Sequence, residues 1–374
     1  MTLCLPRFAA TSDQTLPVAE QVRRAVLTLG VGYAASVLTF AALRRLVGSR
    51  DGWIELADDL EPWSYLPAPL LTVAGLALGS PRLAGLGATM AGVFGLRWGV
   101  RYLRKPAAPA ETGSDVTFMT FNTLAWDREC DDLAASILSA GADVVGLQEI
   151  GPTGAQYLTE TLRHAYPHQY ITPSADSSGA AVFSKFPLRD TVAFRASEMG
   201  HWWQRMIVDT PYGPVTYINL HTKIPHIHTS RRFGRVRFPK YFHAERRRRE
   251  VAWLCAMLAR TDGPVIVGGD FNMTERSQDY AMLALLMRDA YRAAGVGLGH
   301  TFPKVGSYPR TFPAPWPTLR LDYLWHSDHF TTAWAYRGDA GRSDHHPVIA
   351  GLRWMLPASR KQDGRTVPLA ASAV

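Results

Sequence analysis

Several polar residues stand at the ends of short apolar segments, spread over more than two hundred positions of the chain. Each segment is rich in Val, Ile, Leu, Phe or Tyr and has the length of a buried β-strand, so each polar side chain is expected at one edge of a sheet. Acid, amide and imidazole groups gathered at one edge are what metal-assisted cleavage of a phosphate ester requires. These residues are Asn122, Glu149, His221, Asp270, Asn272, Asp322, Asp344 and His345.

The elements that must position these residues first alternate between strand and helix and then become mainly strands. The pattern favours an α/β or α+β sandwich with helices outside the sheets. Helices are expected in DDLAASILSAGA, AQYLTETLRHAY and HAERRRREVAWLCAMLAR. Strands are expected in VTFMTFN, DVVGLQEI, AAVFSKFPL, PVIVGGDFN, RLDYLWHS and HPVIAGLRW, and a hairpin in WWQRMIVDTPYGPVTYINLHT.

The order of the short motifs N, QE, HT, GDFN, LDY and SDHHPV resembles that of the endonuclease/exonuclease/phosphatase family. Each motif alone is weak, but the ordered set is specific and covers residues 115–355. The resemblance implies an α+β fold, a four-layer α/β/β/α sandwich of two mixed sheets with outer helices. It also implies a hydrolase of phosphoric ester bonds that directs water at phosphorus and uses Mg²⁺ or, alternatively, Mn²⁺.

The same resemblance assigns metal-binding roles. Glu149 matches the metal-binding glutamate of the QE motif, and hard divalent ions prefer carboxylate oxygen. Asn122 is expected to contact the same metal region or a phosphate oxygen of the substrate. Asp344 is expected to face the metal side as a second ligand.

Catalytic roles follow in the same way. Asp322 and His345 resemble a paired acid and imidazole in which the carboxylate orients the ring and stabilises its charged form. His346 is expected on the opposite face, because side chains alternate along an extended chain.

Four further residues are expected around the phosphate. Asp270 and Asn272 resemble the pair that positions the attacking water, and spacing leaves open whether Asp270 is itself the general base. His221 is expected to be catalytic or substrate-binding. Arg205, on the preceding strand, is expected either to neutralise phosphate or to form an ordinary surface salt bridge.

An apolar region occupies residues 25–104. Helices are expected at about 25–43, 62–80 and 83–100, and spanning a bilayer takes about 20 apolar residues. We therefore expect a multi-pass membrane protein, with two crossings as the fallback and the sidedness of the catalytic domain open. The alternative for the first helix is a cleaved signal peptide, although no small-residue cleavage site follows it.

The remaining boundaries follow from composition. We expect an N-terminal tail at 1–24, a Pro- and Ala-containing linker at 105–115, one catalytic domain at 116–355 and a flexible tail at 356–374. The cysteines, Cys4, Cys130 and Cys255, have no paired spacing, so neither a disulfide framework nor a zinc site is predicted.

The chain is basic, with a formal net charge of +8 and a pI near 9.5. This favours anionic partners such as nucleic acid, phospholipid headgroups or phosphorylated metabolites. The Arg- and His-rich segment 225–243 is expected either to hold a polyanion or to form an ordinary loop. The arginines at 246–249 are expected on the solvated outer face of the next helix.

Three functions stay open at this point. The first is a membrane-anchored phosphodiesterase acting on a phospholipid or a related phosphodiester. The second is a membrane-tethered endonuclease or exonuclease of the same fold. The third is a noncatalytic binding module, which the complete set of polar residues disfavours.

Overall fold

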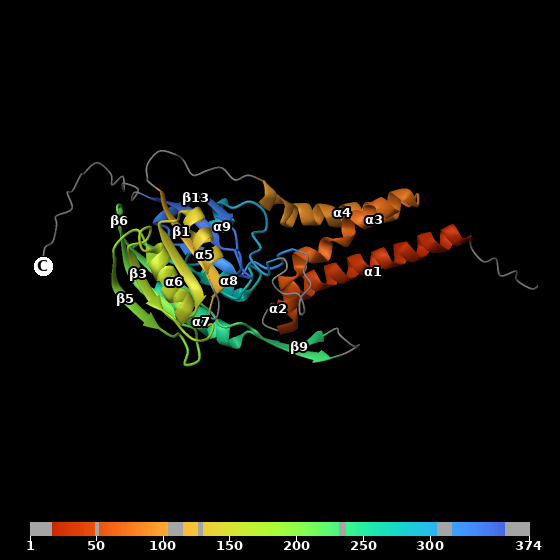
Figure 1. The fold of residues 1–374 in the computed structure, drawn as a ribbon. Helices are drawn as coiled ribbons and strands as arrows, with labels where there is room; N and C mark the ends of the chain where they lie inside the picture. The colour runs from red at the N-terminus through yellow and green to blue at the C-terminus, as the bar shows by residue number, and fades with distance from the viewer. Residues whose placement is uncertain are drawn as a thin grey trace, which may run out of the picture. The chain divides into compact units, whose positions relative to one another are not determined.

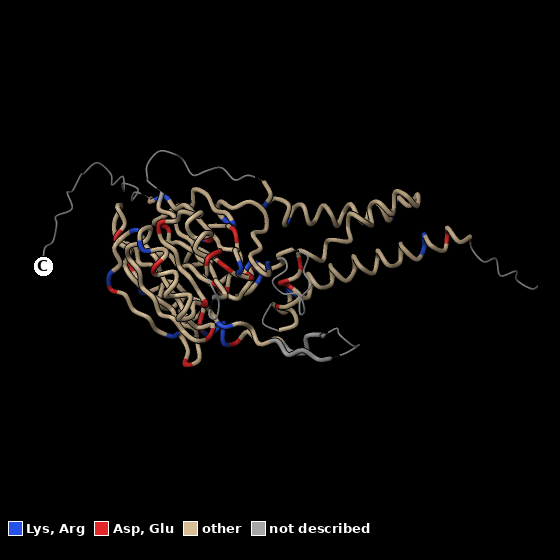
Figure 2. The backbone as a smooth tube through the Cα atoms, viewed as in Figure 1, with Lys and Arg blue, Asp and Glu red and all other residues tan. Residues whose placement is uncertain are grey.

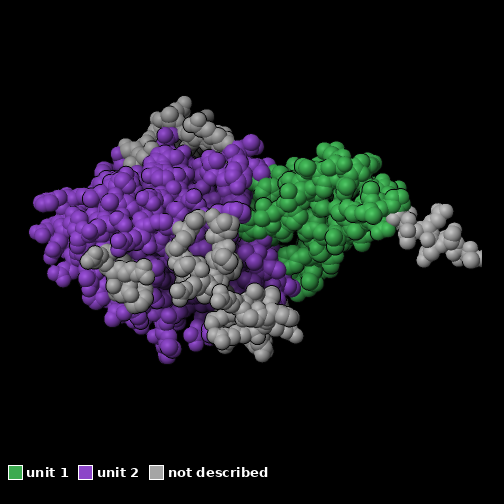
Figure 3. All heavy atoms as spheres, turned by 45° about the vertical axis from the view of Figure 1, so that its right-hand side comes forward, with its two compact units in different colours: residues 1–48, 61–98 green, residues 49–60, 99–374 purple. Residues whose placement is uncertain are grey.

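The computed structural model of the protein describes residues 17–48, 52–103, 115–125, 130–231, 237–304 and 316–355. The chain forms two compact units (Figure 1 and Figure 3). One comprises residues 1–48 and 61–98, and the other comprises residues 49–60 and 99–374. The predicted C-terminal tail and nearly all of the predicted linker lie outside the described residues.

The first unit is helical. Ser80 caps the N-terminus of its last helix by accepting a hydrogen bond from the Leu83 amide, and prolines occupy the first turns of two helices, where no amide partner is needed. Glu61 pairs with Arg97 at 2.7 Å. The elements are α1 (Val18–Val47), η1 (Glu61–Tyr65), α3 (Pro67–Ala77) and α4 (Pro81–Arg97).

The prediction of a multi-pass membrane protein is not supported, because the described residues contain one candidate membrane span rather than three. At 1.5 Å per residue, the 30-residue α1 is about 45 Å long, whereas the 11 residues of α3 reach only about 16 Å. Among the described residues, α1 is the one helix long and apolar enough to cross a bilayer. Figure 2 shows α1 without charge over most of its length. By length and composition, α1 fits either a membrane anchor or a signal sequence.

The catalytic unit contains two six-stranded mixed sheets. The first has the strand order β13-β14-β1-β2-β4-β3, and the second has the order β11-β12-β10-β7-β6-β5. The first is built from β1 (Asp115–Ala125), β2 (Val144–Ile150), β3 (His168–Thr172), β4 (Ala180–Ser184), β13 (Phe330–Arg337) and β14 (Val348–Trp354). The second is built from β5 (Leu188–Phe194), β6 (Trp203–Thr210), β7 (Gly213–His221), β10 (Val265–Asp270), β11 (Arg288–Asp289) and β12 (Asp322–His326).

Three apolar layers hold this sandwich together. The inner faces of the two sheets share one core, which includes Phe118 and Tyr217. The outer face of the first sheet is covered by α5 (Asp131–Ala140) and α6 (Pro152–Leu162). The outer face of the second sheet is covered by α7 (Glu245–Leu258) and α8 (Gln278–Leu283) (Figure 1). The four-layer α/β/β/α prediction is confirmed.

Smaller elements complete this unit. The segment 225–243 forms a two-stranded sheet from β8 (His226–Arg231) and β9 (Arg237–His243), and α9 (Ala290–Ala294) precedes β12. The side chains of residues 227–241, on which the predicted polyanion site depends, lie outside the described residues. Two elements that precede β1 also belong to this unit: α2 (Gly52–Asp59) and η2 (Gly99–Tyr102).

Candidate active site

Strand pairing brings residues from five strands to one rim of the sandwich. Asp270, the last residue of β10, is paired with His221 at the end of β7 and with Asp322 at the start of β12. In the other sheet, Asn122 of β1 is paired with Gln148 of β2, and Glu149 follows directly. The rim is therefore formed where β1, β2, β7 and β10 end.

Alternation along the strands aims these side chains into the space between the sheets. Phe118 and Asn122 lie an even number of positions apart on β1, as do Ile266 and Asp270 on β10, and both apolar residues belong to the shared inner core. The same core thus continues to the rim and becomes polar there. All these groups are buried, and Asp322 is fully inaccessible.

Asn122 links the two sheets at the rim. Its Nδ2 donates to Glu149 Oε1 at 3.2 Å and to Asp270 Oδ2 at 3.0 Å. Its backbone carbonyl accepts from Ser343 Oγ at 2.6 Å, which ties the loop before His345 to β1. One amide group thus fixes the relative positions of two carboxylates from different sheets.

His345 and Asp322 form a close buried pair. The Nδ1 atom of His345 lies 2.8 Å from Asp322 Oδ2, and its Nε2 atom lies 3.8 Å from Asp270 Oδ2. Burial alone would lower the pKa of His345, but the carboxylates of Asp322 and Asp270 outweigh it and raise that pKa to about 10. The ring is therefore an imidazolium at neutral pH.

The carboxylates at this rim fit a divalent cation. Burial raises the pKa of Glu149 and that of Asp270 to about 7 each. The Oδ1 atom of Asp322 is buried without a hydrogen-bond partner. Carboxylate oxygens of Asp270 and Asp322 and a ring nitrogen of His345 lie within 4.8 Å of one another. While His345 is an imidazolium, the ligand atoms that this cluster offers are the carboxylate oxygens. A cation would satisfy the orphaned oxygen and the clustered acids together.

His221 is neutral in this setting. Burial is the main cause that lowers its pKa well below the ordinary value, and the nearby charges of His201 and His345 add to it. Its Nε2 atom lies 3.1 Å from Asn272 Nδ2 and 3.5 Å from Asp270 Oδ2. His221 therefore joins the Asp270–Asn272 pair rather than carrying charge itself.

Backbone strain is concentrated at the same rim. Glu149 has φ 61° and Asn272 has φ 45°, in the left-handed region that residues with a Cβ seldom adopt. The Asn272 amide donates to Asp270 Oδ1 at 2.9 Å, and its side-chain amide donates to the Thr222 carbonyl at 2.9 Å. These contacts hold a conformation that would otherwise be unfavourable.

Comparison with known proteins gives a consistent result. A sequence profile described as the Endonuclease/Exonuclease/phosphatase family matches residues 119–345. The chain belongs to the endonuclease/exonuclease/phosphatase family. It is accordingly a metal-dependent phosphoesterase, and its buried Asp/His cluster is the candidate metal site. A search of curated proteins found no match.

Solved structures share the fold of this family. The endonuclease/exonuclease/phosphatase from Bacteroides vulgatus is 20% identical, with a TM-score of 0.50, and the match covers 65% of this chain and 100% of that one. The D. rerio TDP2 structure, complexed with single strand DNA product, is 17% identical, also with a TM-score of 0.50. That match covers 64% of this chain and 99% of the other.

Most residues that the family resemblance singled out converge at the rim, but not all do. Arg205 lies on β6 on the same face as Trp203, away from the inner core, and its side chain is exposed. Asp344 is buried, and its charge acts on Glu149. His346 turns away, as expected, and its Nδ1 lies 3.0 Å from the Gly338 carbonyl oxygen.

Three residues near the rim were not assigned a role from the sequence. His201 stacks on His221 with ring centroids 3.8 Å apart, and the Phe302 ring lies 4.7 Å from that of His345. Ser343 supports both Asn122 and the His345 amide. Ser343 lies inside the SDHHPV motif, whereas His201 and Phe302 lie outside every motif, so their place near the rim could be found only from the tertiary structure.

Proposed function

We propose that this family member is a membrane-anchored phosphodiesterase that acts on a phospholipid or a related phosphodiester. The observation that carries the chemical part is the Asp322–His345 pair, a buried imidazolium facing the Glu149 and Asp270 carboxylates. The observation that favours a lipid is α1, which is long and apolar enough to anchor the chain.

In this proposal Glu149, Asn122 and Asp344 hold Mg²⁺, with Mn²⁺ as the alternative. When bound, such a cation would supply charge stabilisation to the phosphoryl and leaving oxygens. The carboxylate oxygens at the rim suit either ion, and the Asn122 contacts with Glu149 and Asp270 preorganise them.

Side chains at the rim orient the water, accept its proton and stabilise the phosphate. Asp270 and Asn272 orient the attacking water. Asp270 accepts the proton of that water as its oxygen bonds to phosphorus and the bond from phosphorus to the leaving oxygen breaks. The Nε2–H of the His345 imidazolium donates a hydrogen bond to a nonbridging phosphate oxygen, where negative charge develops. Asp322 keeps that ring charged and oriented, while neutral His221 fixes the Asn272 side chain.

Nucleic acid is the second candidate substrate. The similar D. rerio TDP2 structure holds a single strand DNA product, and the basic composition of this chain suits a polyanion. A DNA or RNA substrate would use the same rim, so the substrate class has to be decided by assay.

The test is a substrate panel with the full chain in detergent. Sphingomyelin, phosphoinositides, DNA, RNA and a chromogenic diester are each incubated with Mg²⁺ and with EDTA. We expect Mg²⁺-dependent hydrolysis of a lipid diester, lost in Glu149→Ala and in His345→Ala. Equal rates in EDTA would contradict the proposed chemistry, and cleavage of nucleic acid alone would replace the lipid with the second candidate.

A further inference from the structure

The segment that joins β10 to α8, residues 271–277, carries Asn272 and is held by two elements from the N-terminal part of the chain. These are α2 and η2, which belong to the same compact unit as the site although they precede β1. Both elements lie within residues 25–104, the region in which the sequence predicted membrane helices. Their charged side chains instead contact residues 271–277 directly or through Arg247.

The first contact runs from α2 through α7. The Glu55 carboxylate is hydrogen-bonded by Arg247, and also by Arg248 at 2.7 Å. Arg247 in turn donates to the Asn272 carbonyl oxygen at 2.7 Å and to Asp279 Oδ2 at 2.9 Å. Both Glu55 and Arg247 are only 1% exposed. The expectation that all four arginines at 246–249 are solvated is therefore wrong for Arg247.

Two further residues of α2 bind the segment 271–277. Asp58 pairs with Arg276 at 2.8 Å, and the Thr274 hydroxyl donates a short hydrogen bond to Asp59. Counting the link through Arg247, α2 is connected to Asn272, Thr274 and Arg276. So many bonds to one short stretch restrict where the strained Asn272 backbone can lie.

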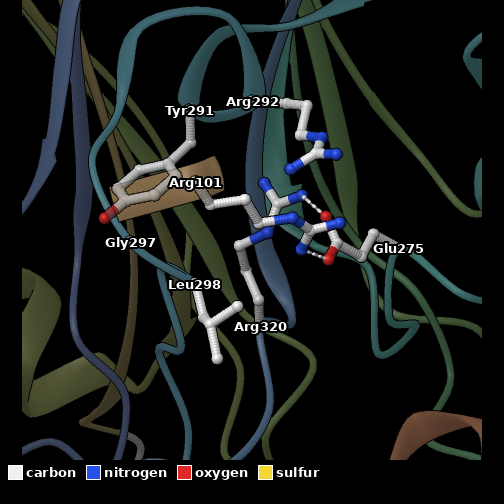
Figure 4. A pocket seen from close by; sticks show the side chains of 7 residues that line it. All are labelled: Arg101, Glu275, Tyr291, Arg292, Gly297, Leu298 and Arg320. Carbon is white, nitrogen blue, oxygen red and sulfur yellow. Dashed lines mark hydrogen bonds and ion pairs between the residues drawn. The ribbon is translucent and has the colours of Figure 1, made fainter. Parts of the chain in front are cut away.

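The second contact with the segment comes from η2. Glu275 accepts hydrogen bonds from Arg101 of η2 and from Arg320, the latter at 3.0 Å (Figure 4). Arg320 is 3% exposed, also pairs with Asp289 at 2.7 Å, and stands two residues before Asp322. This buried cluster thus connects the segment after β10 with the start of β12.

We propose that Glu55 is a positioning residue of the active site. Through Arg247 it holds the backbone of Asn272, so that Asn272 and Asp270 keep the geometry needed for water attack. The expected effect on kcat rests on the proposed function, whereas the expected effect on the structure of residues 271–277 does not. It makes α2 part of the catalytic machinery although α2 lies outside the residues that match the family.

The kinetic test compares Glu55→Ala and Glu55→Gln in the full chain, with the chromogenic diester and Mg²⁺. We expect Glu55→Ala to lower kcat about tenfold with KM unchanged, as for other residues that orient catalytic groups indirectly. Glu55→Gln keeps the shape of the side chain but removes its charge, so its kcat should lie between those of Glu55→Ala and the wild type. The matched control is Ile137→Ala, a fully buried residue of α5 whose loss destabilises the fold without contacting residues 271–277.

Hydrogen exchange supplies a readout that needs no substrate. Peptides covering residues 271–277 should exchange faster in Glu55→Ala than in the wild type, while those covering β2 keep their rate. A kcat loss no larger than in Ile137→Ala, or unchanged exchange at 271–277, overturns the positioning role. If the wild type hydrolyses no substrate, the proposed function fails and the exchange measurement alone decides about Glu55.

Discussion

At the scale of single residues, the site depends on charge states that burial sets. Glu149 and Asp270 are buried acids with raised pKa values, whereas His345 is a buried base whose pKa is raised because two carboxylates face it. A bound cation would lower the pKa of both acids, because it favours their ionised form. This is the electrostatic reason for a divalent cation at the rim.

The His345–Asp322 pair predicts a defined pH dependence of stability. The pKa of His345 rises from the ordinary 6.5 to about 10 on folding, so the pair contributes fully below pH 6.5 and loses its contribution as pH rises through 10. In EDTA, we expect His345→Gln to cost on the order of a few kcal/mol of unfolding free energy near pH 6 and much less near pH 10. Urea unfolding of both proteins across this range measures the difference. A difference that does not vary with pH would contradict the charged pair.

Sequence reasoning identified most of the polar residues at the rim because each stands at the end of an apolar strand. Alternation along the extended chain also predicted that His346 turns away from the side of His345, and in the structure its ring contacts the Gly338 carbonyl oxygen instead. It did not reveal His201, Phe302 or the Glu55–Arg247 pair, because these contacts join distant segments and leave no local periodicity. Whether each rim residue has its assigned role stays a prediction.

At the scale of elements, the lengths of the N-terminal helices differ from what hydropathy predicted. The expected helix at 62–80 is divided, since η1 occupies Glu61–Tyr65 and α3 begins only at Pro67. Proline favours a helix start at its own position and interrupts a helix that has already begun. Hydropathy measures apolar content and is insensitive to that interruption.

Close packing of α3 against α4 can be tested with two glycines of α4. A Cβ at Gly87 would lie 2.8 Å from the Ala68 carbonyl oxygen, whereas a Cβ at Gly85 meets nothing within 4 Å. We expect Gly87→Ala to destabilise the helical unit by about 1–3 kcal/mol through overpacking. Gly85→Ala should instead stabilise it by about 0.4–1 kcal/mol. Thermal unfolding followed by circular dichroism in detergent compares the two, and equal effects would contradict the packing.

At the scale of the whole molecule, the catalytic unit includes parts of the chain on both sides of η1, α3 and α4. Residues 49–60 and 99–103 belong with the sandwich, while residues 61–98 belong with α1. A fragment that begins at residue 106 would therefore retain every family motif but lack Glu55 and Arg101. Assays of the full chain are for this reason more informative than assays of the isolated domain.

Retention of α1 distinguishes an anchor from a signal sequence. We expect the protein expressed in cells to stay in the membrane pellet after alkaline carbonate extraction, because an apolar helix of about 20 residues or more remains inserted. Mass spectrometry of the pelleted protein should find peptides from residues 18–47. A soluble protein whose first residue lies beyond α1 would instead identify a cleaved signal.

In our proposal, separate strand ends form one divalent-cation site at the rim of the sandwich. The most direct measurement is an anomalous difference map from crystals of the full chain soaked in Mn²⁺. We expect a peak at about 2.1 Å from a carboxylate oxygen of Glu149, at the rim shared with Asp270 and His345. An empty rim at saturating Mn²⁺, or a bound ion that touches none of these residues, would contradict it.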